Sequence, residues 1–247
     1  MFKSFLGMMV LVGTALAQEK AQKTVVLVHG AFADGSSWEK VIPLLQAKGL
    51  KVVSVQNPLT SLGDDVAATK RALDASTGPV ILVGHSWAGT VITEAGAHDK
   101  VVALVFVAAF APDAGQSSNE LGKDGPPPPG SANIRPDSSG FLYLTPEGVA
   151  KDFAQDLPAA QTAVMAVTQG PIFSKTFDEK VRNAAWKSKP SWFIVAEKDR
   201  MIRPDLERAM AKRINAKTTT LPTSHVPMLS RPNDVATVIL AAAATVN

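Results

Sequence analysis

Short apolar runs alternate with longer segments of helical periodicity along most of the chain. The runs are rich in valine, isoleucine and leucine, and glycine, proline or asparagine flank them. These features favour strands over buried helix segments, which periodicity alone does not separate. We therefore predict strands over residues 24–28, 51–55, 80–83, 101–107, 191–196 and 217–221.

The segments between these strands place apolar side chains at helical spacing. In one of them Ser61 is a candidate N-cap, and Asp64 and Asp65 follow as negative charges in the first turn. Helices are predicted over residues 38–48, 62–75, 90–97, 204–214 and 232–244. Apolar strands that alternate with helices form parallel sheets covered on both faces. The predicted fold class is therefore α/β, with a mostly parallel central sheet.

The alternation stops between residues 111 and 189, and residues 126–129 are four consecutive prolines that fit neither a helix nor a central strand. Helix-like pieces follow over residues 146–156, 158–167 and 177–188. An insertion here lies over the carboxyl ends of the strands, where ligands bind in open α/β sheets. We predict a cap over about residues 112–189, since a merely decorative insertion leaves its apolar residues uncovered. These include Phe141, Tyr143, Phe153, Met165, Phe173 and Trp186.

The N-terminus has the pattern of a signal peptide. Lys3 is followed by an apolar run over residues 5–16, and small residues precede Gln18 at the positions typical of cleavage. The run is shorter than the roughly 20 residues that span a bilayer, which argues against a membrane anchor. We predict a signal peptide over residues 1–17, a periplasmic or secreted protein without stable membrane insertion, and one domain over residues 22–247.

Composition narrows the functions that this domain can have. The chain has 247 residues, 46% of them hydrophobic, which is enough for one large core. A net charge of +3 with no basic cluster gives no case for a nucleic-acid partner. The absence of cysteine excludes disulfides and thiolate sites, and no pair of the four histidines has helical ligand spacing. We expect no metal and no cofactor, and we leave the oligomeric state open, a homodimer included.

The predicted strand over residues 80–83 leads into Gly84-His85-Ser86-Trp87-Ala88-Gly89. This is the strand–turn–helix arrangement that exposes a nucleophilic serine on a strained turn. Ala88 occupies the position of the last glycine in the usual G-x-S-x-G pattern, and Gly89 follows it. Gly-x-Ser also occurs in ordinary turns, so Ser86 needs partners to qualify as a nucleophile.

A base and an acid for Ser86 must follow other strands at the same edge of the sheet. His225 follows the last predicted strand and is the candidate base; His29, His85 and His98 fit less well by position. Asp199 follows the preceding strand and is the candidate acid that orients the imidazole. Glu197 and Asp113 are its rivals. The resulting chain order, serine, aspartate and histidine, is the order expected of this type of elbow.

An acyl-transfer site also needs two backbone N–H donors for the oxyanion. The residue after the nucleophile, Trp87, supplies one, and the loop after the first strand supplies the other. We assign that donor to Ala31, with Phe32 as the less favoured alternative. The apolar walls of the substrate site are expected to come from Phe32, Trp87, Phe141, Tyr143 and Trp186.

Motifs along nearly the whole mature chain resemble the α/β-hydrolase superfamily, in the branch of plant methyl-salicylate-type esterases and hydroxynitrile lyases with their bacterial relatives. The matching pieces are Val28-His29-Gly30-Ala31 with Gly35 and Trp38, Gln56 to Leu62 with Asp64-Asp65-Val66-Ala67, Gly84-His85-Ser86, Asp199 with Pro204, and Ser224 to Ser230. The chain departs at Trp87-Ala88, where the bacterial relatives usually have Tyr-Gly, which affects the pocket beside the nucleophile.

The resemblance implies the α/β-hydrolase fold and a Ser86–His225–Asp199 triad, and it does not specify the substrate. We expect the triad to cleave a small, mainly apolar ester or lactone held under the cap. A lyase is the first alternative, but Gly30 and Val226 replace the threonine and lysine that the best-matched plant lyases use. A cofactorless haloperoxidase-like enzyme, a carbon–carbon-bond hydrolase and a non-catalytic ligand-binding scaffold all share the triad. The sequence leaves these three alternatives open.

Overall fold

In the computed structural model, residues 22–245 are described. The signal peptide predicted over residues 1–17 lies outside them. No helix in the described part of the chain is long and apolar enough to cross a membrane.

The strands of the body form a six-stranded parallel sheet in the order β2-β1-β3-β4-β8-β9. The strands are β1 (Thr24–Val28), β2 (Lys51–Val55), β3 (Val80–His85), β4 (Val101–Val107), β8 (Ser191–Ala196) and β9 (Lys217–Leu221). Every residue of β1, β3 and β8 is buried, as their continuous apolar sequence predicts for strands covered on both faces. Because all six strands are parallel, their carboxyl ends lie at one edge of the sheet.

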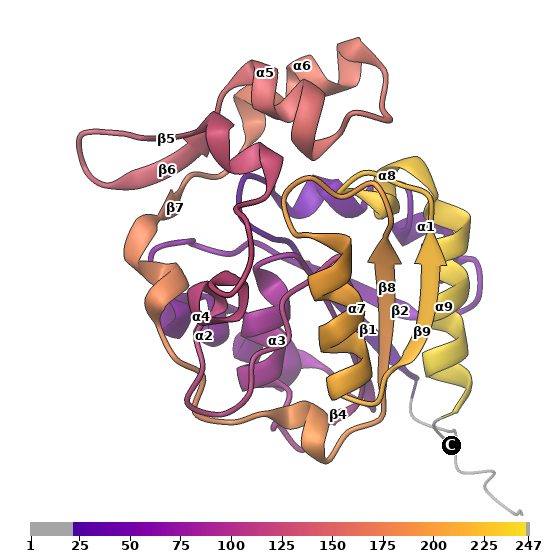
Figure 1. The fold of residues 1–247 in the computed structure, drawn as a ribbon. Helices are drawn as coiled ribbons and strands as arrows, with labels where there is room; N and C mark the ends of the chain where they lie inside the picture. Colours follow the sequence, from indigo (N-terminus) through magenta and orange to yellow (C-terminus); the bar gives the residue numbers. More distant parts are fainter. Residues whose placement is uncertain (1–21, 246–247) are drawn as a thin grey trace, which may run out of the picture.

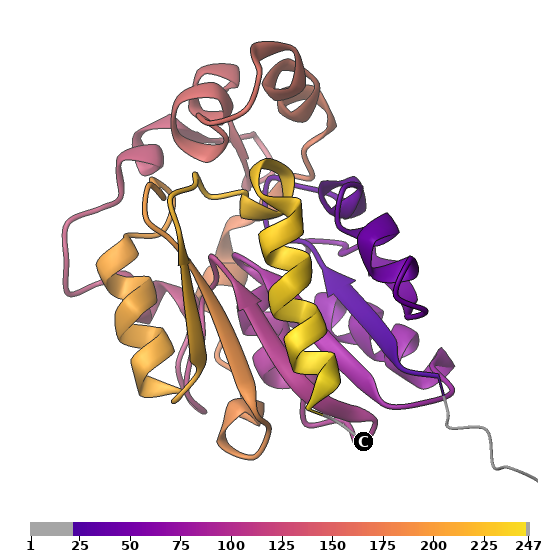
Figure 2. The same ribbon diagram turned by 90° about the vertical axis from the view of Figure 1, so that its right-hand side faces the viewer.

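Helices cover both faces of this sheet (Figures 1 and 2). Helices α2 (Leu62–Ala75), α3 (Ala88–Ala95) and α7 (Pro204–Arg213) pack on one face, and α1 (Ile42–Gln46) and α9 (Pro232–Ala244) on the other, with α8 (Pro227–Ser230) leading into α9. The Ser61 side chain accepts the Asp64 N–H and caps α2 as predicted. The helix predicted over residues 38–48 is shorter: a 3-10 turn, Gly35–Trp38, precedes α1, which has Pro43 in its first turn.

The segment between β4 and β8 rises in its middle part over the carboxyl ends of the strands, whereas its first helix lies beside α3 (Figure 1). Its helices are α4 (Ser118–Gly122), α5 (Pro146–Gly148), which continues into a π-helical turn over Val149–Phe153, and α6 (Ala159–Thr168). It also holds a three-stranded antiparallel sheet of β5 (Ile134–Pro136), β6 (Phe141–Leu144) and β7 (Ile172–Phe173), which the sequence did not predict.

The prediction of a helix over residues 177–188 is wrong. The segment holds only short 3-10 turns, Ser174–Asp178 and Ala185–Lys187. The backbone between these turns forms hydrogen bonds with other parts of the chain. The Val181 N–H donates to the Gln116 carbonyl, and the N–H groups of Arg182 and Asn183 donate to the Glu94 carboxylate of α3. Because these N–H groups donate to acceptors elsewhere in the chain, they cannot form the backbone hydrogen bonds of a helix over residues 177–188.

Candidate active site

Ser86 lies on the turn between β3 and α3 in a left-handed conformation, with φ of 53°. Such a conformation is strained for a serine and is typical of functional turns. Backbone bonds fix it: the Ser86 N–H donates to the Val107 carbonyl at 3.2 Å, and the Phe110 N–H donates to the Ser86 carbonyl at 3.2 Å. A Cβ atom on Gly89 would lie 2.0 Å from the Phe110 carbonyl oxygen, so the glycine that this turn needs stands at Gly89.

His225 and Asp199 form a buried pair beside this turn. The His225 Nδ1 lies 2.5 Å from Asp199 Oδ2, and the side chains are 1% and 0% exposed. Asp199 Oδ1 accepts the N–H groups of Met201 at 2.6 Å and Ile202 at 2.9 Å, so the carboxylate is held from both sides. With Nδ1 bound to the carboxylate, Nε2 is the ring nitrogen left for a proton from a nucleophile. His225 and Ser86 line the same cavity.

The other histidines have different partners. The His85 Nε2 lies 2.8 Å from the His225 carbonyl oxygen, and burial lowers the pKa of His85 well below its usual value, so the ring is neutral and supports the His225 loop. The His29 Nε2 accepts the Asn57 N–H at 2.9 Å. The His98 Nε2 lies 3.0 Å from the Asp74 carboxylate.

The rival acids lie away from the imidazole. Asp113 forms an ion pair with Lys187 at 2.5 Å, and Glu197 is exposed. Of the three carboxylates considered, Asp199 is the one that the structure brings to His225.

The loop after β1 lies directly against Ser86. A Cβ atom on Gly30 would come within 2.7 Å of the Ser86 Cβ and 2.9 Å of the His85 carbonyl oxygen, so only glycine permits this approach. The Phe32 N–H donates to the Gly170 carbonyl of the cap at 3.1 Å and is therefore used. Ala31 lines the cavity next to Ser86.

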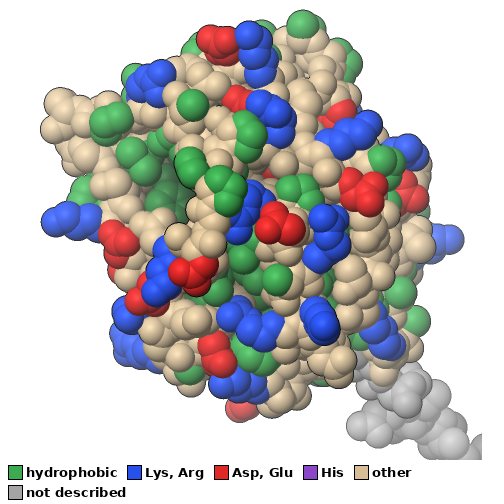
Figure 3. All heavy atoms as spheres, in the orientation of Figure 1, with side chains coloured by type: hydrophobic (Ala, Val, Ile, Leu, Met, Phe, Trp, Pro, Cys, Tyr) green, Lys and Arg blue, Asp and Glu red, His purple; other side chains and the backbone are tan. Residues whose placement is uncertain are grey.

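A cavity of about 640 Å³ lies over Ser86 between the body and the cap. Figure 3 shows hydrophobic side chains gathered in a hollow below the cap. The apolar lining residues are Ala31, Phe32, Phe110, Ile134, Leu142, Phe177, Met201, Ile202 and Leu206, with prolines of the 126–128 segment. The walls are thus largely apolar, as in typical small-molecule sites.

Of the predicted walls, Phe32 lines this cavity, whereas the structure places the others elsewhere. Leu142 faces the cavity, so its strand neighbours Phe141 and Tyr143 point to the opposite side of β6. The Phe141 ring packs on Phe173, and Tyr143 is 39% exposed. Trp186 donates its indole N–H to the Pro112 carbonyl at 2.8 Å, away from Ser86.

The Trp87 indole also points away from the cavity, into the core. Its Nε1–H donates to Asp65 Oδ2 at 2.8 Å, and its ring packs edge-on against Phe177. Asp65 Oδ1 accepts the Leu59 N–H at 2.8 Å, and burial raises the pKa of Asp65 to about 6. The sequence identified Asp65 only as a negative charge in the first turn of the helix. On a helix that begins after Ser61, Asp65 shares the inward face with buried residues three and four positions away.

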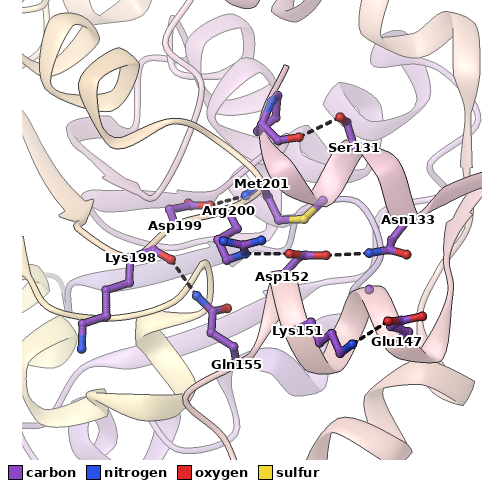
Figure 4. A network of polar contacts seen from close by, with 12 residues as sticks. Ser131, Asn133, Glu147, Lys151, Asp152, Gln155, Lys198, Asp199, Arg200 and Met201 are labelled. Carbon is purple, nitrogen blue, oxygen red and sulfur yellow. Dashed lines mark hydrogen bonds and ion pairs between the residues drawn. The ribbon is translucent and has the colours of Figure 1, made fainter. Parts of the chain in front are cut away.

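The cap is tied to the loop that carries Asp199 (Figure 4) and also to the residue before His225. Asp152 accepts the Arg200 Nε–H at 2.7 Å and the Asn133 amide at 2.7 Å. Gln155 donates to the Lys198 carbonyl at 2.6 Å, so both neighbours of Asp199 in the chain contact the cap. The remaining links are the Gly130 N–H to the Arg200 carbonyl at 2.8 Å and the Ser224 N–H to Asp156 Oδ2 at 2.9 Å.

Among residues 22–245, no group of three histidine, aspartate or glutamate side chains lies close enough together to hold a metal ion. The arrangement described so far is that of a serine with a histidine–carboxylate pair.

A model of the alpha/beta hydrolase family matches residues 25–238. The chain belongs to this family. The α/β hydrolase is 29% identical to Methylesterase 3 of Arabidopsis thaliana, over 91% of this chain and 97% of that protein. It is 26% identical to a pyrethroid hydrolase of Sphingobium wenxiniae, over 87% of this chain and 85% of that protein. These relatives confirm the resemblance to the plant esterase branch.

Solved structures of the family have the same fold as this α/β hydrolase. A crystal structure of a pyrethroid hydrolase superimposes with a TM-score of 0.78 at 23% identity, over 90% of this chain and 97% of that one. Polyneuridine aldehyde esterase superimposes with a TM-score of 0.75 at 19% identity, over 89% and 98% of the two chains. The predicted fold class is therefore confirmed.

Proposed function

We propose that this α/β hydrolase cleaves a small, mainly apolar carboxylic ester or lactone through an acyl-enzyme on Ser86. The observation that carries the proposal is the 2.5 Å contact between His225 Nδ1 and Asp199 Oδ2, at a cavity that Ser86 also lines. The methylesterase and pyrethroid hydrolase relatives support ester hydrolysis as the reaction.

The reaction begins with transfer of the Ser86 Oγ proton to His225 Nε2 as the oxygen attacks the ester carbonyl carbon. Asp199 holds the imidazole in the tautomer that accepts this proton and stabilises the imidazolium. The negative charge on the carbonyl oxygen is stabilised by the N–H groups of Ala31 and Trp87. His225 then gives its proton to the leaving alkoxide, which departs as the alcohol.

Water completes the cycle. His225 takes a proton from a water molecule, whose oxygen attacks the acyl carbon, and the bond from that carbon to Ser86 Oγ breaks as Oγ regains the proton. The products are one carboxylic acid and one alcohol, and for a lactone both groups are on the same molecule. Every proton is returned, so the chain needs no co-reactant besides water.

The volume and walls of the cavity support the substrate class. About 640 Å³ accommodates a small organic ester, and apolar side chains such as Phe32, Leu142 and Phe177 favour apolar acyl or alcohol groups. Because the Trp87 indole is bound to Asp65, Trp87 contributes to the proposed reaction through its backbone N–H.

The first test is hydrolysis of p-nitrophenyl esters, from acetate to octanoate, by the wild type and Ser86→Ala. We expect turnover that depends on Ser86, with a loss of about 10⁶-fold in kcat in the variant. The chain length with the highest kcat/KM measures the space above Ser86. Retained turnover by folded Ser86→Ala would contradict the triad, and no turnover by the wild type would favour a lyase, another triad reaction or a binding protein.

The acid is tested by a matched pair of variants in the same assay. Asp199→Asn is expected to lower kcat by about 10⁴-fold, because the amide favours the wrong imidazole tautomer. Glu197→Gln removes an exposed carboxylate two residues away and should leave kcat unchanged. The reverse ranking would move the acid to Glu197.

We also propose that the protein is exported with cleavage before Gln18. The pattern over residues 1–17 supports this. N-terminal sequencing of protein from the culture medium or the periplasm should begin at Gln18.

A further inference from the structure

A second carboxyl group lies buried behind the triad acid. Glu207 belongs to α7, the helix that follows the Asp199 loop and packs on β8. Its side chain has no solvent exposure. The proposed mechanism does not use it, yet a fully buried glutamate is rare and costly unless it is paired, and no ion pair of Glu207 is formed among the described residues.

The two oxygens of Glu207 have different surroundings. Oε2 accepts the N–H of Ala196, the last residue of β8, at 2.9 Å. Oε1 is buried and has no N–H or O–H partner among the described residues. Besides the Ala196 N–H, the Glu207 carboxyl meets the Asp199 carboxyl within hydrogen-bond reach. A hydrogen bond between two carboxyl groups requires a proton on one of them.

The donors around the pair decide which group carries the proton. Asp199 receives three N–H donors, from Met201, Ile202 and the His225 imidazole. Glu207 receives one, from Ala196. Because donors stabilise the ionised form, Asp199 is the carboxylate and Glu207 is the acid. Burial, followed by the charge of Asp199, raises the pKa of Glu207 well above its usual value, in agreement with this assignment.

We propose that Glu207 is a neutral carboxylic acid that donates a hydrogen bond to the Asp199 carboxylate and is a positioning residue for the proposed triad. The bond adds a donor to those that already hold the Asp199 carboxylate, and it spreads part of the Asp199 charge onto Glu207. Glu207 thereby keeps Asp199 in register with His225.

The charged groups near Glu207 determine how a change in its charge reaches His225. Asp199 comes from the loop after β8, and Arg208 is next to Glu207 on α7 and only weakly favours the ionised form. His225, from the loop after β9, contacts Asp199 Oδ2. A change in the charge of Glu207 therefore acts on the pKa of His225 through Asp199.

Two variants separate the neutral acid from an ionised one. In Glu207→Gln the amide oxygen accepts the Ala196 N–H and the amide N–H donates to Asp199, so the variant copies the neutral acid. We expect its kcat, its KM and the pKa of His225 to equal those of the wild type. Glu207→Met keeps the length of the side chain but has no donor, so kcat should fall by about 10- to 100-fold with KM unchanged. The pKa of His225 should rise by about one unit, because the Asp199 charge is no longer shared.

The pKa of His225 is measured by NMR titration of protein labelled at histidine, with His225→Gln as the assignment control, and in parallel from the acid limb of kcat/KM. A lower His225 pKa in Glu207→Gln would show that a negative charge had been removed and would overturn the proposal. An unchanged His225 pKa and kcat in Glu207→Met would reduce Glu207 to a packing role and overturn it as well. If Glu207→Met does not fold, the titration of Glu207→Gln decides alone. The titration needs no turnover, so it distinguishes failure of this proposal from failure of the esterase assignment.

Discussion

At the residue scale, the site depends on the backbone of two residues: Ser86, which is in a strained conformation, and Gly30, where neighbouring atoms leave no room for a side chain. Ser86 adopts a left-handed conformation because the turn is held on both sides by bonds to the strand β4 region. Gly30 lets the neighbouring loop come into contact with Ser86. These two residues bring Ser86 into contact with the loop that carries the proposed Ala31 donor.

Gly30→Ala should therefore separate the loop from the nucleophile. The added Cβ would meet the Ser86 Cβ at 2.7 Å and the His85 oxygen at 2.9 Å, and both belong to the rigid turn. We expect kcat to fall by about 10²-fold or more as the Ala31 N–H shifts, and the free energy of unfolding to fall by about 1–3 kcal/mol. Ester hydrolysis and urea unfolding measure the two effects.

Gly63→Ala is the matched control for that substitution. A Cβ on Gly63 would meet its nearest neighbour, the Ser61 hydroxyl oxygen, at 3.7 Å, and the residue lies in helix α2. Activity should be unchanged, and stability should rise by about 0.5–1 kcal/mol from the better helix propensity. Normal activity in Gly30→Ala would show that the loop can move without effect on the reaction.

At the element scale, the cap is part of the scaffold that positions the triad. Its π-helical turn and the residues just after it contact the Asp199 loop and the residue before His225. The two loops that carry the proposed acid and base are therefore held by the same cap segment, and Figure 4 shows its contacts with the Asp199 loop. A displacement of this segment should change kcat as well as KM.

Asp152→Ala tests this role of the cap. The side chain of Asp152 is 4% exposed and that of Arg200 is 46% exposed, so the pair is only partly screened by solvent. Its removal leaves Arg200 and the Asn133 amide without their partner, and we expect a loss of about 1–3 kcal/mol in the free energy of unfolding. A lower kcat in ester hydrolysis should accompany it.

Glu147→Gln is the control in the same segment. The Glu147–Lys151 ion pair is 61% and 70% exposed, and exposed pairs contribute less than about 1 kcal/mol. Stability and kcat should both stay close to those of the wild type. Equal effects of the two substitutions would show that the cap contributes only general stability.

At the scale of the whole molecule, Asp65 links the stability of the fold to pH. Its pKa is about 6 in the folded protein against an ordinary value of 3.8, so the folded state binds the proton more tightly than the unfolded state does. The contribution of Asp65 to stability is therefore greatest at low pH and decreases as pH rises from 3.8 through about 6. With each pKa unit equal to about 1.4 kcal/mol, the full decrease is about 3 kcal/mol.

Denaturant unfolding of the wild type and Asp65→Asn at about pH 4.5 and about pH 7.5 measures this effect. The asparagine does not titrate, so the stability of the wild type relative to the variant should fall by about 2–3 kcal/mol between the two conditions. A constant difference would show that Asp65 titrates normally in the folded protein, against the burial of its carboxyl group beside Trp87.

The sequence alone determined the fold class and the candidate triad of this protein. Continuous apolar strands between helices require a parallel sheet, and in a parallel sheet all carboxyl ends lie at one edge. Residues that directly follow strands then lie along the same edge of the sheet. For this reason Ser86, Asp199 and His225 could be selected together, and the structure brings Asp199 to His225 and Ser86 to the same cavity.

Only the tertiary structure decided what each side chain meets. The pleat of β6 directs Leu142 to the cavity and Phe141 away from it, and no periodicity within the irregular cap reveals that strand. Phe32 donates its N–H to Gly170, 138 positions later by the numbering of the two residues, so sequence could not reveal that this donor is used. In the sequence, Asp65 and Glu207 carry the same carboxyl groups as the acidic residues on the surface of their helices, so residue type does not distinguish them. Their burial against Trp87 and Asp199 follows from how the helices pack on the sheet, because a side chain's partners are set by contacts between segments that are distant in the chain.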